Sequence, residues 1–335
     1  MPTLTVGLPV HNGMPYLPET VESLLAQTWR DFELLVIDDG STDGTADYLA
    51  TLSDSRVRVV HQDNRGLQRT LNRLLDECAT DWLVRQDADD IALPERLAVI
   101  AEHAARYPDT GVFYSMAEYH DMGPRRVSFR QTVGSPAVLR NLTRAGYLLA
   151  ICHPTAVLHV GRTRAVGGYR PQFTAAEDSD LWWRMSLAHD IRMIPQTLLA
   201  YRLVPGSISS THLLRQARQQ VYIQYLLLSH LWGLEPQPPA AVRDTLDGLL
   251  DLELLRYREH VRRAGMAYGR RRYARSAVSA ARAVLASPRS LARRLRYEAR
   301  PASAPAVAGV EPILFATHSD ALWPGQLAPA GTPDA

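Results

Sequence analysis

The residues best suited to chemistry in this chain form a short acidic run, Gln86-Asp87-Ala88-Asp89-Asp90. Its three carboxylates repel one another, and burial makes that repulsion stronger. A divalent cation would relieve it, and hard oxygen ligands suit Mg²⁺ or Mn²⁺, metals that commonly carry phosphate groups. Because a lone Asp-x-Asp can also be a solvated acidic turn, the surrounding elements must decide between the two interpretations.

Strands and helices are predicted to alternate through the first 110 residues. Apolar stretches at 4–8, 32–37, 57–60, 82–84 and 112–114 have the length of buried strands, and the segments between them have helical periodicity. Repeated strand–helix units imply an α/β fold with a mostly parallel sheet covered by helices. In such folds, ligands bind outside the carboxyl ends of the strands.

Polar side chains follow four successive predicted strands. His11 and Asn12 come after the first strand, Asp39 after the second, Asn64 after the third, and the acidic run after the fourth. A single motif of this kind arises easily by chance. Four of them at one sheet edge predict a shared binding site.

A second Asp-x-Asp, Asp178-Ser179-Asp180, begins a helix expected to end near His189. Helix N-termini favour negative charge, so capping is the alternative role for Glu177 or Asp180. Asp178 stands three and four residues before Leu181 and Trp182, which places it on the inward face. An ionised carboxylate there could accept a proton from an attacking hydroxyl, as in inverting glycoside hydrolysis with an acceptor alcohol in place of water.

Composition excludes several classes of function. The formal net charge of +2 argues against a nucleic-acid partner. All 37 basic residues are arginine, which excludes Schiff-base and Walker-type lysine mechanisms. Neither a G-x-G-x-x-G nor a G-x-x-x-x-G-K-[ST] loop is present, so a bound phosphate must be handled by metal and arginine. A nucleoside diphosphate that leaves with the help of a metal fits these limits.

The two cysteines, Cys78 and Cys152, occur in apolar surroundings, which disfavours a disulfide framework or a zinc site. The first residues lack the pattern of a signal peptide, and the apolar run at 221–234 is too short to span a bilayer. We therefore expect a cytoplasmic protein.

Taken together, these motifs resemble those of bacterial family 2 glycosyltransferases, which are inverting, nucleotide-sugar-dependent enzymes with the GT-A fold. The matching segments cover about residues 3–210 in the family's order: 7–13, 23–28, 31–43, 64–67, 71–73, 85–90, 93–97, 153–155, 167–169, 176–184, 201–202 and 205–209. No single segment is specific, but the combination is.

The resemblance implies a role for each matching residue. The nucleotide base would contact Pro9, Val10, Asn12 and Asp39, and the ribose and phosphates would lie near Asp87 and Ala88. Asp89 would bind a Mn²⁺ or Mg²⁺ ion, and Asp178 would be the catalytic base. Asp90 would be a structural residue, and His11, Glu177 and His153 would be accessory residues. For His153, a ligand role and a structural role carry equal weight. The chain departs from the family at two positions: His11 replaces a frequent Tyr, and Val204 replaces a frequent His near the metal and diphosphate.

The expected domains are a catalytic region and a helical extension. Residues 1–210 would form the GT-A domain, with a nucleotide-binding half at 1–110 and an acceptor half at 111–210. A helical region at 211–298 would follow, in which 211–234 and 240–260 are rich in Leu and 262–286 is rich in Arg and Ala. The Pro/Ala-rich tail at 299–335 is expected to be disordered. Residues 256–300 hold 14 Arg and two Glu, which indicates peripheral contact with the inner face of the cell membrane or a solvated helical face.

The predicted function is metal-dependent transfer of a sugar from a nucleoside-diphosphate sugar, expected to be a UDP-sugar. The acceptor would be a hydroxyl of a glycan or lipid-linked glycan in cell-surface polysaccharide biosynthesis. Two alternatives stay open. One is a sugar nucleotidyltransferase, which would need a Gly-rich N-terminal loop that residues 7–13 do not supply. The other is a non-catalytic nucleotide-sugar-binding protein, for which Val204 is the only support.

Overall fold

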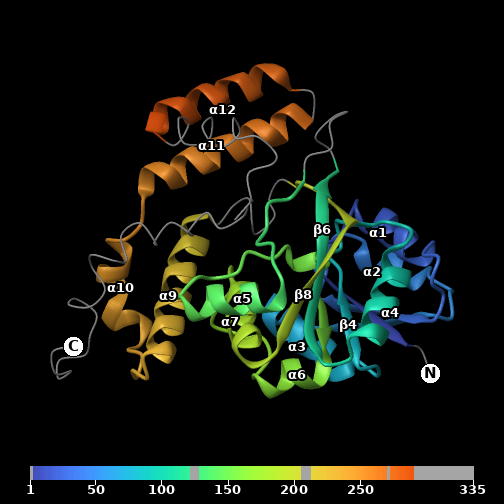
Figure 1. Cartoon of the computed structure of the whole chain (residues 1–335). Coiled ribbons are helices and arrows are strands. Elements are labelled where there is room, and N and C mark those ends of the chain that lie inside the picture. Colours follow the sequence, from blue (N-terminus) through green and yellow to red (C-terminus); the bar gives the residue numbers. More distant parts are fainter. Residues whose placement is uncertain (1–2, 121–127, 205–212, 270–271, 290–335) are drawn as a thin grey trace.

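The computed structural model describes residues 3–120, 128–204, 213–269 and 272–289. An eight-stranded sheet has the order β3-β2-β1-β4-β7-β6-β8-β5, and helices pack on both of its faces (Figure 1). The predicted α/β fold with a mostly parallel sheet is therefore confirmed.

Four parallel strands form the first half of the sheet: β1 (Leu4–Val10), β2 (Phe32–Asp39), β3 (Val57–Gln62) and β4 (Trp82–Arg85). All seven residues of β1 are buried, because a central strand is covered by helices on each face. The crossover helices are α1 (Leu17–Leu25), α2 (Thr45–Ala50) and α3 (Leu67–Glu77). Parallel pairing brings the carboxyl ends of the four strands to one edge, as the sequence predicted.

Mixed strand directions characterise the second half of the sheet. β7 (Val157–His159) pairs antiparallel with β4 and with β6 (Thr110–Tyr119), and the short strand β5 (Ile91–Ala92) is antiparallel to β8 (Asp190–Tyr201). β6 is longer than the strand expected at 112–114, because it pairs in parallel with β8 along its whole length. The remaining helices of this region are α4 (Arg96–Arg106), α5 (Pro136–Arg144), η1 (His153–Thr155), α6 (Val160–Ala165) and α7 (Glu177–Ala188).

Each face of the sheet has its own hydrophobic cluster. On one face, α1, α2 and α4 contribute buried residues such as Leu24 and Ile100. On the other, α3 and α7 contribute Leu74, Leu181 and Trp182. Because Leu181 and Trp182 are both 0% exposed, they fix the rotation of α7 about its axis and hence the direction of its first residues.

Four further helices follow the sheet: α9 (Leu213–Leu231), α10 (Pro239–Asp247), α11 (Leu252–Gly269) and α12 (Tyr273–Ala286). α9 and α10 share a buried cluster with Trp183 of α7, so they extend the buried core beyond the sheet. α11 and α12 form a hairpin beyond them (Figure 1). In the described part of the chain, no helix has both the length and the apolar content that crossing a membrane requires.

The composition of this region does not mark where its helices end. The Leu-rich segment 240–260 is divided between α10 and α11, because the carboxylate of Asp251 accepts a hydrogen bond from the Leu254 N–H at 2.9 Å and starts a new helix. α11 continues past residue 261, where the sequence changes from Leu-rich to Arg- and Ala-rich. The expected domain boundary at 210 and the tail at 299–335 lie outside the described residues.

Candidate active site

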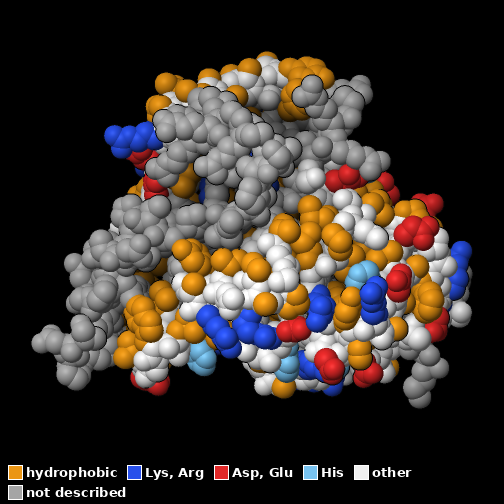
Figure 2. Space-filling view, in the orientation of Figure 1, with side chains coloured by type: hydrophobic (Ala, Val, Ile, Leu, Met, Phe, Trp, Pro, Cys, Tyr) orange, Lys and Arg blue, Asp and Glu red, His pale blue; other side chains and the backbone are white. Residues whose placement is uncertain are grey.

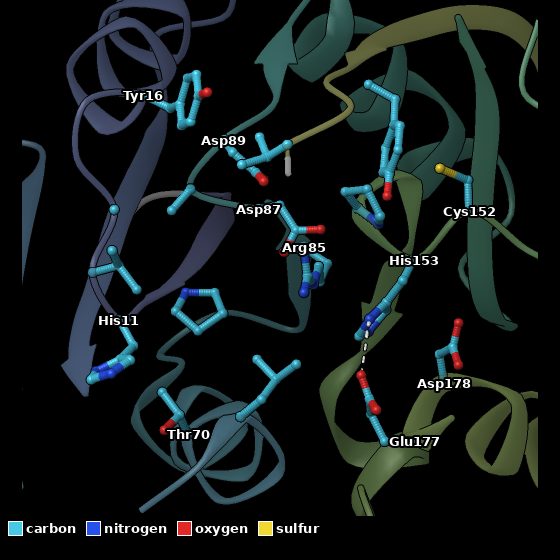
Figure 3. A pocket seen from close by; sticks show the side chains of 18 of the residues that line it. His11, Tyr16, Thr70, Arg85, Asp87, Asp89, Cys152, His153, Glu177 and Asp178 are labelled. Atoms are coloured by element: carbon cyan, nitrogen blue, oxygen red, sulfur yellow. Dashed lines mark ion pairs between the residues drawn. The ribbon is translucent and has the colours of Figure 1, made fainter. Parts of the chain in front are cut away.

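A cavity of about 820 Å³ opens where the parallel strands end (Figure 3). The loops after β1, β2 and β4 form one wall, and η1 with the start of α7 forms the opposite wall. The cavity is lined by every residue that the sequence analysis gave a binding or catalytic role, and by Val204: Pro9, Val10, His11, Asn12, Asp39, Asp87, Ala88, Asp89, His153, Glu177 and Asp178.

Asp39 at the end of β2 organises the loop that follows β3. Its Oδ1 accepts hydrogen bonds from Gln62 Nε2 at 2.6 Å and from the Arg65 N–H at 2.8 Å, and its Oδ2 accepts one from the Gly66 N–H at 2.9 Å. The neighbouring Gly40 has φ +72°, and a Cβ there would lie 2.8 Å from the backbone nitrogen of Asn64. The two loops therefore approach each other too closely for any side chain at position 40.

His11 and Asn12 join the first strand-end loop to the second. The Nδ1–H of His11 donates to the carbonyl oxygen of Asp39 at 2.9 Å. Asn12 has φ +55°, its Oδ1 accepts from the Thr42 N–H at 2.8 Å, and its own N–H donates to Ser41 Oγ at 2.9 Å. These bonds tie the two loops together at the rim of the cavity.

The carboxylates of the acidic run lie together but face different ways. Asp87, Asp89 and Asp90 each have one carboxylate oxygen that lies within 4.8 Å of the oxygens of the other two. Asp90 is 0% exposed, and its Oδ1 accepts from the backbone N–H of Arg202 at 2.8 Å. Asp87 forms an ion pair with Nη1 of the buried Arg85. Asp87 and Asp89 remain on the cavity wall.

The donor set fits a divalent cation. Burial, together with the nearby charge of Asp87, raises the pKa of Asp89 to about 7. A nearby cation stabilises the ionised form of such a carboxyl group and lowers its pKa. Hard carboxylate oxygens at this spacing match Mn²⁺ or Mg²⁺ better than a soft metal.

Arg85, to which the sequence analysis gave no role, stands at the electrostatic centre of the site. Burial alone would lower the pKa of its guanidinium, but the adjacent Asp87 reverses this effect and the pKa is raised. Burial raises the pKa of four surrounding carboxyl groups, and the charge of Arg85 opposes each of these shifts; the four are Asp89, Asp90, Glu177 and Asp178. A basic residue ending an apolar strand directly before the acidic run was the signal that could have identified it.

The first turn of α7 places two carboxylates across the cavity from the acidic run (Figure 3). Glu177 accepts from Gln68 Nε2 at 3.3 Å, and burial followed by the charge of Asp178 raises the pKa of Glu177 to about 7. Asp178 is half-buried, and burial raises its pKa above the ordinary value; hydrogen bonds from Ser179 and the charge of Arg85 offset only part of this rise. Its position at a helix N-terminus also favours the ionised form.

His153 is held inside the fold by a hydrogen bond between its Nε2 and the hydroxyl of Tyr169 at 2.8 Å. Burial and the charge of Arg85 put the pKa of His153 well below its usual value, so the ring is neutral. Its Nδ1 lies 3.9 Å from Glu177 Oε1 (Figure 3). The tyrosine bond fits a structural role, and a neutral imidazole is also the form that acts as a ligand.

An aromatic wall and two residues of the C-terminal helices also line the cavity, and neither was predicted from the sequence. Tyr119, Phe129 and Tyr201 line the cavity, with ring centroids 5.3–5.8 Å apart. Gln216 of α9 and Arg262 of α11 line it as well. Nothing in the spacing of these residues along the chain could have indicated that they meet.

Comparison with known proteins agrees with this site. A model described as "Glycosyl transferase family 2" matches residues 5–161, a little under half of the chain. These residues belong to glycosyl transferase family 2. The family 2 match contains the four parallel strands, the acidic run and η1. It ends before α7, so Asp178 lies beyond it.

Curated relatives carry names of the same kind. The chain is 30% identical over 192 residues to "Putative glycosyltransferase EpsE" of Bacillus subtilis, over 55% of this chain and 66% of that protein. It is 29% identical over 196 residues to "O-antigen biosynthesis protein RfbC" of Myxococcus xanthus, over 56% of this chain and 15% of that protein. The chain thus spans just under two thirds of the first relative and far less of the second.

Two solved structures share the fold. TarS of S. aureus in complex with UDP has a TM-score of 0.51 at 16% identity, over 83% of this chain and 89% of that chain. Mannosyltransferase PcManGT from Pyrobaculum calidifontis in complex with GDP-Man and Mn²⁺ has a TM-score of 0.51 at 18% identity, over 89% of this chain and 79% of that chain. The family 2 region therefore has the GT-A fold.

Proposed function

We propose that the chain transfers a sugar, with inversion, from a nucleoside-diphosphate sugar to a hydroxyl of a glycan or lipid-linked acceptor. We expect the donor to be a UDP-sugar and the product to serve cell-surface polysaccharide biosynthesis. The observation that carries the proposal is that one cavity joins the nucleotide-side loops and the acidic run to Asp178 on the opposite wall. The names of the relatives and the ligands of TarS and PcManGT agree with this class of reaction.

On the donor side, Pro9, Val10, Asn12 and Asp39 would surround the base, and Asp87 and Ala88 would lie near the ribose and phosphates. Asp89, with Asp87 beside it, would hold Mn²⁺ or Mg²⁺. The bound ion would supply Lewis-acid stabilisation of the departing diphosphate. Arg85 adds a fixed positive charge on the same side.

On the acceptor side, Asp178 would accept the proton of the attacking hydroxyl. The group must be ionised to do so. Burial raises its pKa overall, and the hydrogen bonds from Ser179, the charge of Arg85 and the helix N-terminus act in the opposite direction and favour the ionised form. The aromatic wall of Tyr119, Phe129 and Tyr201 offers apolar ring faces against which a sugar acceptor could pack.

A thermal-shift screen tests the donor half. Nucleoside diphosphates and nucleotide sugars are compared with and without Mn²⁺ or Mg²⁺, and we expect one nucleotide series to stabilise the chain in a metal-dependent way. Failure of every nucleotide to stabilise it would contradict the proposal. Release of pyrophosphate from a nucleoside triphosphate and a sugar phosphate would instead identify a nucleotidyltransferase.

Replacing Asp178 by Asn tests the catalytic half. We expect hydrolysis or transfer of the sugar to fall by about 10²–10⁴-fold, the usual contribution of a general base, while nucleotide binding is kept. Asp47→Asn, on the exposed surface of α2, is the matched control and should be fully active. An active Asp178→Asn enzyme would refute the assignment, and a wild-type chain that binds donor and metal without turning over would be a binding protein.

A further inference from the structure

Helix α12 presents an apolar face away from the rest of the protein. Its inner face packs on α11, where Ser276 Oγ donates to the carbonyl oxygen of Ala264 at 2.9 Å and Ala283 is 3% exposed. On the opposite side, seven exposed apolar residues share one helical face; we call this the α12 stripe, and it consists of Tyr273, Ala274, Ala277, Val278, Ala281, Val284 and Leu285.

The larger members of the α12 stripe are strongly exposed: Tyr273 by 59%, Val278 by 53% and Leu285 by 81%. Tyr268, 50% exposed at the end of α11, continues the surface through an edge-on contact with Tyr273 at 5.7 Å. Figure 2 shows hydrophobic side chains gathered along the edge of the molecule formed by α12. Single exposed apolar residues are ordinary, but a continuous stripe marks an interaction surface.

The charged residues of the segment that carries the stripe have one sign. Between Glu259 and Glu298 the sequence contains no Asp or Glu, whereas it contains 11 Arg. Arg275 and Arg282, one heptad apart, lie along one flank of the stripe, and within the described residues neither forms an ion pair with a carboxylate. An apolar face with arginines at its border is the pattern of a helix that lies in a membrane interface.

We propose that the α12 stripe binds the surface of an anionic lipid bilayer, with its apolar residues among the acyl chains and Arg275 and Arg282 at the headgroup phosphates. A second copy of the chain fits less well, because a symmetric contact through this face would bring arginines together with no acidic residue between them. A nucleic acid would use the charge and leave the apolar stripe uncovered.

The hairpin also connects this surface to the active site. α11 packs against α12 and contributes Arg262 to the wall of the catalytic cavity. A chain bound through α12 would therefore hold its cavity close to the membrane, where a lipid-linked acceptor resides. This consequence rests on the proposed function, whereas membrane binding itself does not.

Vesicle sedimentation of the full chain tests the proposal. Vesicles of phosphatidylcholine alone are compared with vesicles in which about a third of the lipid is phosphatidylglycerol, and we expect binding to the anionic vesicles that weakens with salt. Each basic residue near such a surface contributes roughly fivefold to binding, so Arg275→Gln with Arg282→Gln should weaken binding about 25-fold. Leu285→Asp should weaken it at least as much.

Val138→Asp is the control, because Val138 is a similarly exposed residue (47%) on α5, and this variant should bind vesicles normally. Circular dichroism and a retained nucleotide-dependent thermal shift would show that the α12 variants are folded and that donor binding is intact. Equal binding to neutral and anionic vesicles, or wild-type binding by both α12 variants, would overturn the proposal. A dimer that Leu285→Asp converts to a monomer would instead assign the stripe to a second copy.

Discussion

The backbone N–H of Arg202 donates to Oδ1 of Asp90 at 2.8 Å, and this bond ties the end of β8 to the loop after β4. The guanidinium of Arg202 adds hydrogen bonds to the carbonyl oxygen of Asp89 at 2.9 Å and to Glu19 at 2.6 Å. The acidic run is thus divided between two tasks. Asp90 holds the loop in place, while Asp89 is presented to the cavity.

Replacing Asp90 by Ala should destabilise the fold by about 1–3 kcal/mol, because the buried N–H of Arg202 loses its acceptor. Asn keeps an acceptor oxygen at that position. Burial and the charges of Asp87 and Asp89 already raise the pKa of Asp90, so the loss of its negative charge should matter little. Asp90→Asn should therefore lower the free energy of unfolding by less than about 1 kcal/mol. Urea unfolding of both variants without metal measures the difference. Equal losses would mean that the charge of Asp90, and not its acceptor oxygen, holds the loop.

Replacing Arg96 should be more damaging, because its side chain is fully buried and donates to three oxygens from two separate segments. It donates to Gln86 Oε1, and at 2.7 Å to each of the carbonyl oxygens of Arg85 and Pro154. Lysine cannot reproduce this planar fork, so Arg96→Lys should cost roughly 2–4 kcal/mol in the free energy of unfolding. Arg106→Lys, on the exposed end of the same helix, should change it by less than about 0.5 kcal/mol; similar losses in both variants would contradict this account.

Replacing Asp89 by Asn should remove metal-dependent nucleotide binding. A nucleoside diphosphate at about 100 times its Kd stabilises a protein by roughly 2.7 kcal/mol, and we expect most of the metal-dependent part of this gain to disappear. Thermal shift with UDP, with and without Mn²⁺, measures it, and Asp47→Asn again serves as the unaffected control. If Mn²⁺ still gave its full additional stabilisation in the Asp89→Asn protein, the metal site would not include Asp89.

Glu177 should make the stability of the metal-free protein pH-dependent. Its folded-state pKa of about 7 lies above the ordinary value of 4.5, so the folded chain holds this proton more tightly than the unfolded chain. Its contribution is therefore fully present below about pH 4.5 and is lost as the pH rises to about 7, with a slope of at most about 1.4 kcal/mol per pH unit.

The matched measurement compares urea unfolding of the wild type with that of Glu177→Gln at several pH values in the presence of a chelator. Glutamine does not titrate, so the free energy of unfolding of the wild type should decrease relative to that of Glu177→Gln as the pH increases. A difference that does not change between pH 5 and pH 8 would show that Glu177 ionises normally in the folded chain.

The sequence by itself determined the first half of the sheet and the residues along its edge. Apolar runs with helical segments between them define strand–helix units, and parallel pairing leaves little choice about where the ends of β1, β2, β3 and β4 lie. For that reason, the strand-end residues that were given a binding role line one cavity, whereas Asp90 at the end of the acidic run is buried. Asp178 could be oriented as well, because its distance from Leu181 and Trp182 fixes its side of the helix.

Only the tertiary structure decided which groups these residues meet. Arg85 became the centre of charge because η1 and α7 close around the end of β4, and Asp90 became structural because Arg202, 112 positions away, reaches it. The aromatic wall and Arg262 likewise come from segments far apart in the chain. Periodicity and turn chemistry act over a few neighbouring residues, whereas these contacts depend on packing between elements, which no local pattern encodes.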